Sequence, residues 1–327
     1  MSIHNNAQHS LQRKHAIATG KCTDHLGSVQ VSPIDNFNLD DTIFQTLEGY
    51  LPRLVMKARI AKSIVWSQEK IEQIERRFAL APPSKSIDPT VLEFMLSECD
   101  FSMEHADGTF MEHLLFCHDY AEAHYREHSP TILLLHSIMG TATNTFAMTA
   151  DKIPALKELV TERDFRQIQA FPSILRLLTS GSLFDALEGN LLRVDQLKEI
   201  VFYRVIDNQQ CALSATEFWQ QLNHHLIHLV DFLPPANWAH HKSDPVFQTF
   251  VRLSQFLDDS KNRKANVGFE SPDKKGFFSF PQQEKMSFGG ALSMVIPGWA
   301  QRNLAAKSVR KFSANIGHSL DFELIWK

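Results

Sequence analysis

The sequence lacks several features by which common protein classes are recognised. Its four cysteines lie far apart and form no CxxC pair, so neither a zinc ribbon nor a disulfide framework is indicated. A GxSxG elbow, a Walker loop and a GxGxxG loop are also missing. The chain therefore lacks the motifs by which serine hydrolases, P-loop nucleotidases and dinucleotide-binding enzymes are usually recognised.

An excess of charge and a long apolar run are missing as well. The 33 basic and 37 acidic residues give a formal net charge of -4, which provides no bulk attraction for nucleic acid or an anionic membrane. No stretch approaches the roughly 18 apolar residues of a membrane span, and the N-terminus lacks the apolar core of a secretory signal. We therefore predict a cytoplasmic protein with no membrane span and no nucleic-acid partner, acting on a small molecule.

Helical periodicity is what the sequence has in abundance. The chain of 327 residues is 43% hydrophobic, enough for a large packed core, and its apolar residues recur mostly at three- and four-residue spacing. The predicted helices span residues 40–66, 67–80, 88–99, 109–127, 130–140, 152–160, 162–178, 193–208, 214–233, 244–259 and 300–318. Ser214 and Glu217 have the spacing of a capping box. With no alternating strand before residue 276, the predicted fold class is all-α.

Composition divides this helical chain into four parts. Residues 1–35 are polar and aperiodic, which predicts a flexible N-terminal arm. Residues 36–257 form the predicted helical domain, and the charged, apolar-poor stretch 258–276 is expected to be a linker or long loop. Residues 277–327 are Phe- and Gly-rich and then basic, and we expect this C-terminal extension to wrap around or dock onto the domain.

Histidine is the residue type that most needs a chemical explanation, because the chain contains 16. His105 precedes a turn, His113 lies on the next predicted helix, and His136 ends the apolar helix after that. Two consecutive antiparallel helices pack side by side, so His113 and His136 can converge on one point. Imidazole is the commonest protein ligand of zinc, iron and similar ions. The alternative is that both rings are hydrogen-bonded core residues.

Other histidines are less informative. His118 lies about 140° around the helix from His113, so these two cannot share one ion. His224 and His228 are one helical turn apart, a spacing that can chelate a metal. Position 225 holds His225 where the HExxH motif requires glutamate, and a surface or core role for the pair stays open.

The stretch "HADGTFMEHLLFCHDYAEAHYREHSPTILLLHSIMGT" resembles the HD-domain superfamily of helical metal-dependent phosphohydrolases. It is most similar to an uncharacterised bacterial family with an HD-like fold. The matching positions are His105, Gly108 and Thr109; Glu112, His113 and Leu114; and Leu134, His136, Ser137, Gly140 and Thr141. The resemblance covers residues 90–180, with Met139 in place of the family's tyrosine, and it implies an HD-like helical bundle.

The resemblance also implies a site and a reaction. His113, His136 and Asp207 would be metal ligands, and His105 a ligand or general base. The divalent ion, manganese, iron or zinc, would activate water for attack on a phosphate ester or nucleotide-like molecule. Ser137 stands where HD hydrolases place a metal-binding aspartate, and serine is a much poorer ligand.

Two other functions remain open at this point. One is an HD-like di-iron oxygenase, which needs further carboxylates. The other is a catalytically inactive binding or scaffold protein that retains the HD-like core and keeps its histidines as hydrogen-bonded core residues. Metal content would distinguish the scaffold from both enzymes.

Overall fold

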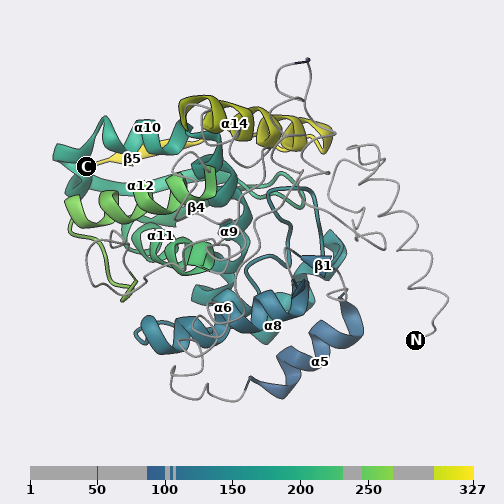
Figure 1. Ribbon diagram of the computed structural model, residues 1–327. Coiled ribbons are helices and arrows are strands. Elements are labelled where there is room, and N and C mark those ends of the chain that lie inside the picture. Colours follow the sequence, from purple (N-terminus) through teal and green to yellow (C-terminus); the bar gives the residue numbers. More distant parts are fainter. Residues whose placement is uncertain (1–49, 51–86, 100–103, 106–107, 231–244, 268–297) are drawn as a thin grey trace, which may run out of the picture.

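A computed structural model describes residues 50, 87–99, 104–105, 108–230, 245–267 and 298–327 (Figure 1). The predicted N-terminal arm, the helices expected between residues 40 and 80 except for residue 50, and residues 268–297 lie outside the described residues. The helices are α5 (Pro89–Glu98), α6 (Phe110–His124), α7 (Thr131–Leu134), α8 (Ile153–Leu159), α9 (Glu162–Ser180), α10 (Ser182–Glu188), α11 (Ala215–Val230), α12 (Pro245–Asp259) and α14 (Gly298–Asn315). Two 3-10 helices, η1 (Ala150–Lys152) and η2 (Leu191–Gln196), accompany the strands β1 (Glu104–His105), β2 (Gly108–Thr109), β3 (Leu197–Tyr203), β4 (Gln210–Ser214) and β5 (Glu323–Trp326).

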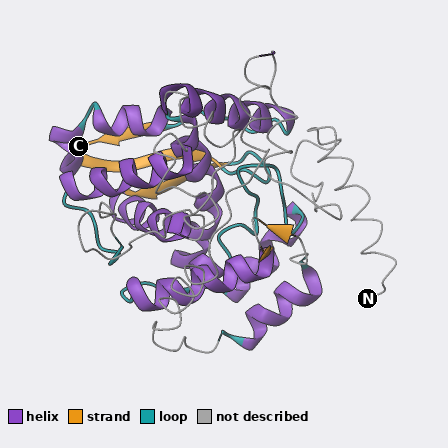
Figure 2. Cartoon of the chain, in the orientation of Figure 1, coloured by secondary structure: helices purple, strands orange, loops and turns teal. Residues whose placement is uncertain are grey.

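Helices dominate the described residues, as the periodicity predicts (Figure 2). Helix α9 is central and packs against α7, α8, α10, α11, α12 and α14. The Thr161 side chain caps its start by accepting a hydrogen bond from the Asp164 amide. Gly181, in the left-handed region with φ 83°, ends it, as expected of a C-terminal glycine.

The prediction of a helix over residues 193–208 is wrong. This segment contains β3, which pairs antiparallel with β4 and with β5 to give a three-stranded sheet of order β4-β3-β5. Ile200 and Phe202 are buried and the residues flanking each are more exposed, which is the two-residue period of a strand. In a short apolar run, periodicity alone does not distinguish a buried strand from a buried helix.

The helix predicted over residues 130–140 is much shorter than expected. Helix α7 ends at Leu134, and the ring Nδ1 of His136 hydrogen bonds with the Leu133 carbonyl at 2.6 Å. The His136 side chain thereby occupies the Leu133 carbonyl, which would accept a backbone hydrogen bond if the helix continued. Gly140, at φ 127°, follows in the turn, where a Cβ would lie 2.9 Å from Phe146 Cε1.

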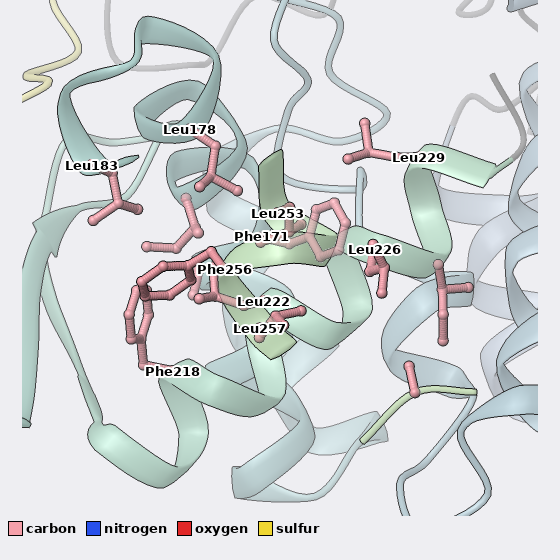
Figure 3. Packing of buried hydrophobic residues seen from close by; sticks show 14 of the residues in the cluster. Phe171, Leu178, Leu183, Phe218, Leu222, Leu226, Leu229, Leu253, Phe256 and Leu257 are labelled. Atoms are coloured by element: carbon pink, nitrogen blue, oxygen red, sulfur yellow. The ribbon is translucent and has the colours of Figure 1, made fainter. Parts of the chain in front are cut away.

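Two clusters of buried hydrophobic residues hold the elements together. The larger one joins α9, α11, α12 and the sheet, and Figure 3 shows Phe171 and its leucine and phenylalanine neighbours within it. The second joins α5, α7, α8 and the residues that follow β3. In Figure 1, β5, α10 and α12 are seen toward one end of the view, whereas α5, α6 and α8 gather at the opposite end. None of the described helices is both long and apolar enough to cross a membrane.

Candidate metal centre

Three residues from two neighbouring segments form a buried group of nitrogen and sulfur atoms. His113 lies on α6, Cys117 lies one turn further along that helix, and His136 follows α7, which packs against α6. Residues four apart share a helix face, so Cys117 accompanies His113. One atom from each residue lies within 4.8 Å of the others, and all three side chains are buried.

The spacing of these atoms matches that of ligands around one ion. The Nε2 atoms of His113 and His136 are 3.2 Å apart, and two nitrogens bound to one tetrahedral zinc ion lie about 3.3 Å apart. Cys117 Sγ is 3.9 Å from His113 Nε2, compared with about 3.6 Å for nitrogen and sulfur on one zinc ion. A small adjustment of the thiol would therefore complete three corners of a tetrahedron.

The hydrogen bond of His136 fixes which of its nitrogens carries the proton. The Leu133 carbonyl can only accept, so His136 Nδ1 donates to it. In the neutral ring this leaves a lone pair on Nε2, the atom that faces His113. Metal-binding histidines typically donate their second ring nitrogen to a carbonyl or carboxylate in this way.

Burial keeps His113 neutral. Removal from water lowers the pKa of His113 to about 3, because the low-dielectric interior disfavours the charged imidazolium. A neutral imidazole has the lone pair that a metal ion needs.

Helix α11 brings three more buried histidines to the same interior. Ser214 and Glu217 form the predicted capping box at its start, with the Glu217 carboxylate accepting from the Ser214 amide at 3.0 Å and its hydroxyl at 2.7 Å. The His228 ring centroid is 5.1 Å from that of His113 and 4.6 Å from that of His136. The candidate centre is thus surrounded from α6, α7 and α11.

His224 and His225 lie next to His228 on α11 and are 1% and 0% exposed. Burial lowers the pKa of both rings. Among the described residues, the Nδ1 atom of each has no hydrogen-bond partner. The His225 ring packs against Phe171 of α9 at an interplanar angle of 42°, and the His224 ring contacts Tyr125. This interior therefore holds more imidazole nitrogen than its own hydrogen bonds use.

The other residues predicted for the site are placed as follows. Asp207 is not part of the His-Cys-His group: it lies in the turn between β3 and β4, where both carboxylate oxygens accept from Arg204. The backbone of His105 pairs with Gly108 in the short hairpin before α6, and its side chain lies outside the described residues. His118 is paired with Asp119 at 2.9 Å and is also absent from the group, as its position on the helix predicts.

Cys117 and the placement of His228 were missed by sequence reasoning. The four-residue spacing of Cys117 from His113 is a signal that could have identified the cysteine. For His228, the sequence offered only its one-turn spacing from His224 as a sign of metal binding. Nothing in the sequence indicates that α11 packs against α6.

Comparisons with family models, with curated proteins and with solved structures found no match. The resemblance of residues 90–180 to HD-like proteins therefore stays a prediction.

Proposed function

We propose that this protein is a metal-dependent hydrolase whose ion is held by His113 and His136, with Cys117 beside them. The observation that carries the proposal is the His113–His136 pair, with Nε2 atoms 3.2 Å apart and the His136 tautomer set by the Leu133 carbonyl. This arrangement presents neutral nitrogen donors in a buried interior.

The donor set bears on the identity of the ion. Imidazole nitrogen and thiolate sulfur suit zinc and iron, whereas carboxylate and water oxygens suit magnesium and manganese. The His-Cys-His group contains no carboxylate. Of the three ions that the sequence suggests, zinc and iron therefore fit better than manganese, and a carboxylate-rich di-iron centre gains no support from the described residues.

The reaction class comes from the resemblance to HD-like phosphohydrolases. A bound ion would polarise a phosphate ester and lower the pKa of a water molecule toward 7. The residues of the chain bind and orient that ion, and His105 would hold or accept the proton of the water. The proposed substrate is a phosphate ester or nucleotide-like small molecule.

A catalytically inactive scaffold is the second candidate, and one observation favours it. The 3.2 Å between the two Nε2 atoms is also the length of a direct N–H···N hydrogen bond, and the His136 ring is 0% exposed. Two histidines paired in this way would be satisfied core residues that need no ion.

Elemental analysis of the purified protein separates the two candidates. Wild type is expected to contain about one equivalent of zinc or iron, and the double variant His113→Gln/His136→Gln is expected to contain none. His118→Gln is the matched control, because it removes a buried histidine on α6 that is not in the group. A metal-free wild type would contradict the proposal and favour the scaffold.

Turnover tests the hydrolytic part. With p-nitrophenyl phosphate and bis(p-nitrophenyl) phosphate as probes, wild type and His118→Gln should release nitrophenol and the double variant should not. A metal-loaded wild type that hydrolyses neither probe would refute hydrolysis of simple phosphate esters while leaving metal binding intact.

Ligand-linked stability gives an independent readout. An ion that binds only the folded state raises the free energy of unfolding by about 2.7 kcal/mol at a free concentration 100 times its Kd. Urea unfolding of wild type should shift by that amount on metal addition and return on chelation. The double variant should show no shift, and an equal shift in both proteins would place the ion elsewhere.

A further inference from the structure

We propose that His228 is the third nitrogen ligand of this centre, so that α6, the turn after α7 and α11 each bring an imidazole to one ion. This inference rests on the proposed metal site and specifies its ligand set.

The three rings are spaced as three ligands of one ion would be. Adding the half-width of an imidazole to the zinc–nitrogen bond puts a ring centroid about 3.2 Å from the ion, so two rings at a tetrahedral angle have centroids about 5.2 Å apart. The observed separations are 5.1 Å for His113 and His136, 5.1 Å for His113 and His228, and 4.6 Å for His136 and His228. All three pairs are close to the expected value.

Their mutual orientation agrees with this arrangement. The interplanar angles of the three pairs are 75°, 80° and 69°, so the rings meet edge to face and do not stack. Rings inclined in this way can each direct one nitrogen to a common point, whereas parallel stacked rings would direct their nitrogens past one another. His113, His136 and His228 are 4%, 0% and 5% exposed, so the site they enclose is buried.

Neighbouring side chains are less well placed as the third ligand. The ring contacts of His225 are to Phe171, and those of His224 are to Tyr125 and His128. Cys117 Sγ is 3.9 Å from His113 Nε2, longer than the roughly 3.6 Å expected for nitrogen and sulfur on one zinc ion. His228 is therefore the third nitrogen donor of the proposed set, and Cys117 borders the fourth position.

This ligand set specifies a class of ion. Three imidazoles with a fourth position left for water or substrate is a recurrent arrangement of catalytic zinc. Magnesium and calcium require oxygen ligands, which the three rings do not supply. We infer a site for Zn²⁺, or for Fe²⁺ or Co²⁺ in its place.

Metal affinity of single variants tests the inference. Apo wild type, His228→Gln, His225→Gln and His118→Gln would be titrated with Zn²⁺ against a chromophoric chelator, and their folding compared by circular dichroism. We expect the Kd of His228→Gln to rise at least 100-fold. His225→Gln, which removes a buried histidine from the same helix, and His118→Gln should stay within a few-fold of wild type.

Cobalt spectroscopy keeps the test decisive if His228→Gln folds poorly. In a Cys117→Ser background, His228→Cys retains a ligand at the proposed corner, and Co²⁺ should then show a near-ultraviolet thiolate-to-cobalt charge-transfer band. Cys117→Ser alone should bind Co²⁺ without that band. A Co²⁺-loaded His228→Cys protein that lacks the band would overturn the inference.

The two proposals fail in different ways. No metal in wild type would refute the metal centre itself. Metal that is lost in His113→Gln and His136→Gln but bound with wild-type affinity by His228→Gln would leave the centre standing and refute the role of His228. A large loss of affinity in His225→Gln, without one in His228→Gln, would do the same.

Discussion

Two buried polar regions of this protein differ in how their groups are satisfied. Around Arg176, which is 0% exposed, donors meet acceptors: the guanidinium donates to the Thr141 carbonyl, to Asn144 Oδ1 at 2.8 Å and to Ser313 Oγ at 3.0 Å. In the interior around His113, His136 and the histidines of α11, the facing polar groups are imidazole rings. The Nε2 atoms of His113 and His136 lie 3.2 Å apart.

The difference separates a structural network from the proposed metal site. The Arg176 network joins α9, α14 and the turn after Gly140 with donors and acceptors that match, and an added ligand would only disrupt it. The imidazoles on α11 include His224 and His225, whose Nδ1 atoms have no hydrogen-bond partner among the described residues. An interior of this second kind offers nitrogen atoms that the proposed ion would bind.

The largest expected effect comes from breaking the structural network. Arg176→Met leaves the Thr141 carbonyl and Asn144 Oδ1 buried without the donors they now have. We expect the free energy of unfolding to fall by about 3 kcal/mol or more, measured by urea denaturation. Zinc bound per folded molecule should be unchanged, and a variant that loses its zinc while staying fully folded would show that the two regions are not separate.

An intermediate effect is expected for the pH dependence contributed by His318, which belongs to the same network. Burial, with a smaller contribution from Arg176, lowers the pKa of His318 to about 3. The unfolded state therefore binds the proton first as pH falls below about 6.5, and stability is lost from there down to about pH 3. By pH 5 this group alone should have cost about 2 kcal/mol.

His318→Gln tests this contribution. Its amide can still donate to the Tyr203 carbonyl, which His318 Nε2 now contacts at 2.9 Å, but it does not titrate. Unfolding measured at pH 7 and at pH 5 should show a smaller loss of stability in the variant than in wild type. Equal losses in the two proteins would mean that His318 does not titrate in this range.

The smallest expected effect concerns the helix that carries His228. Ser214→Ala removes the hydroxyl that donates to Glu217 at the start of α11, and loss of a helix cap costs about 1 kcal/mol. The zinc Kd should change little, because the cap lies more than three turns before His228 on an otherwise intact helix. A Kd that rises as much as in His228→Gln would show that the start of α11 positions the centre.

Local patterns in the sequence predicted most of the helices and part of the site. Capping at Ser214 and Glu217 and the convergence of His113 with His136 both depend on residues near one another in the chain. Strand β3 was mistaken for helix because its apolar run fits both periods, and β5, its partner, is distant in sequence. His228 joins the group only through the packing of α11 against α6, which no local spacing encodes.

Burial of the three rings also governs how fast an ion could exchange. His113, His136 and His228 are almost fully buried, so exchange of an ion held between them, like entry of a substrate, would depend on local opening of the segments around them. Release would then require α11 to separate locally from α6, an opening event with its own free energy. The residence time of the ion would follow the rate of that opening more closely than the strength of any one bond.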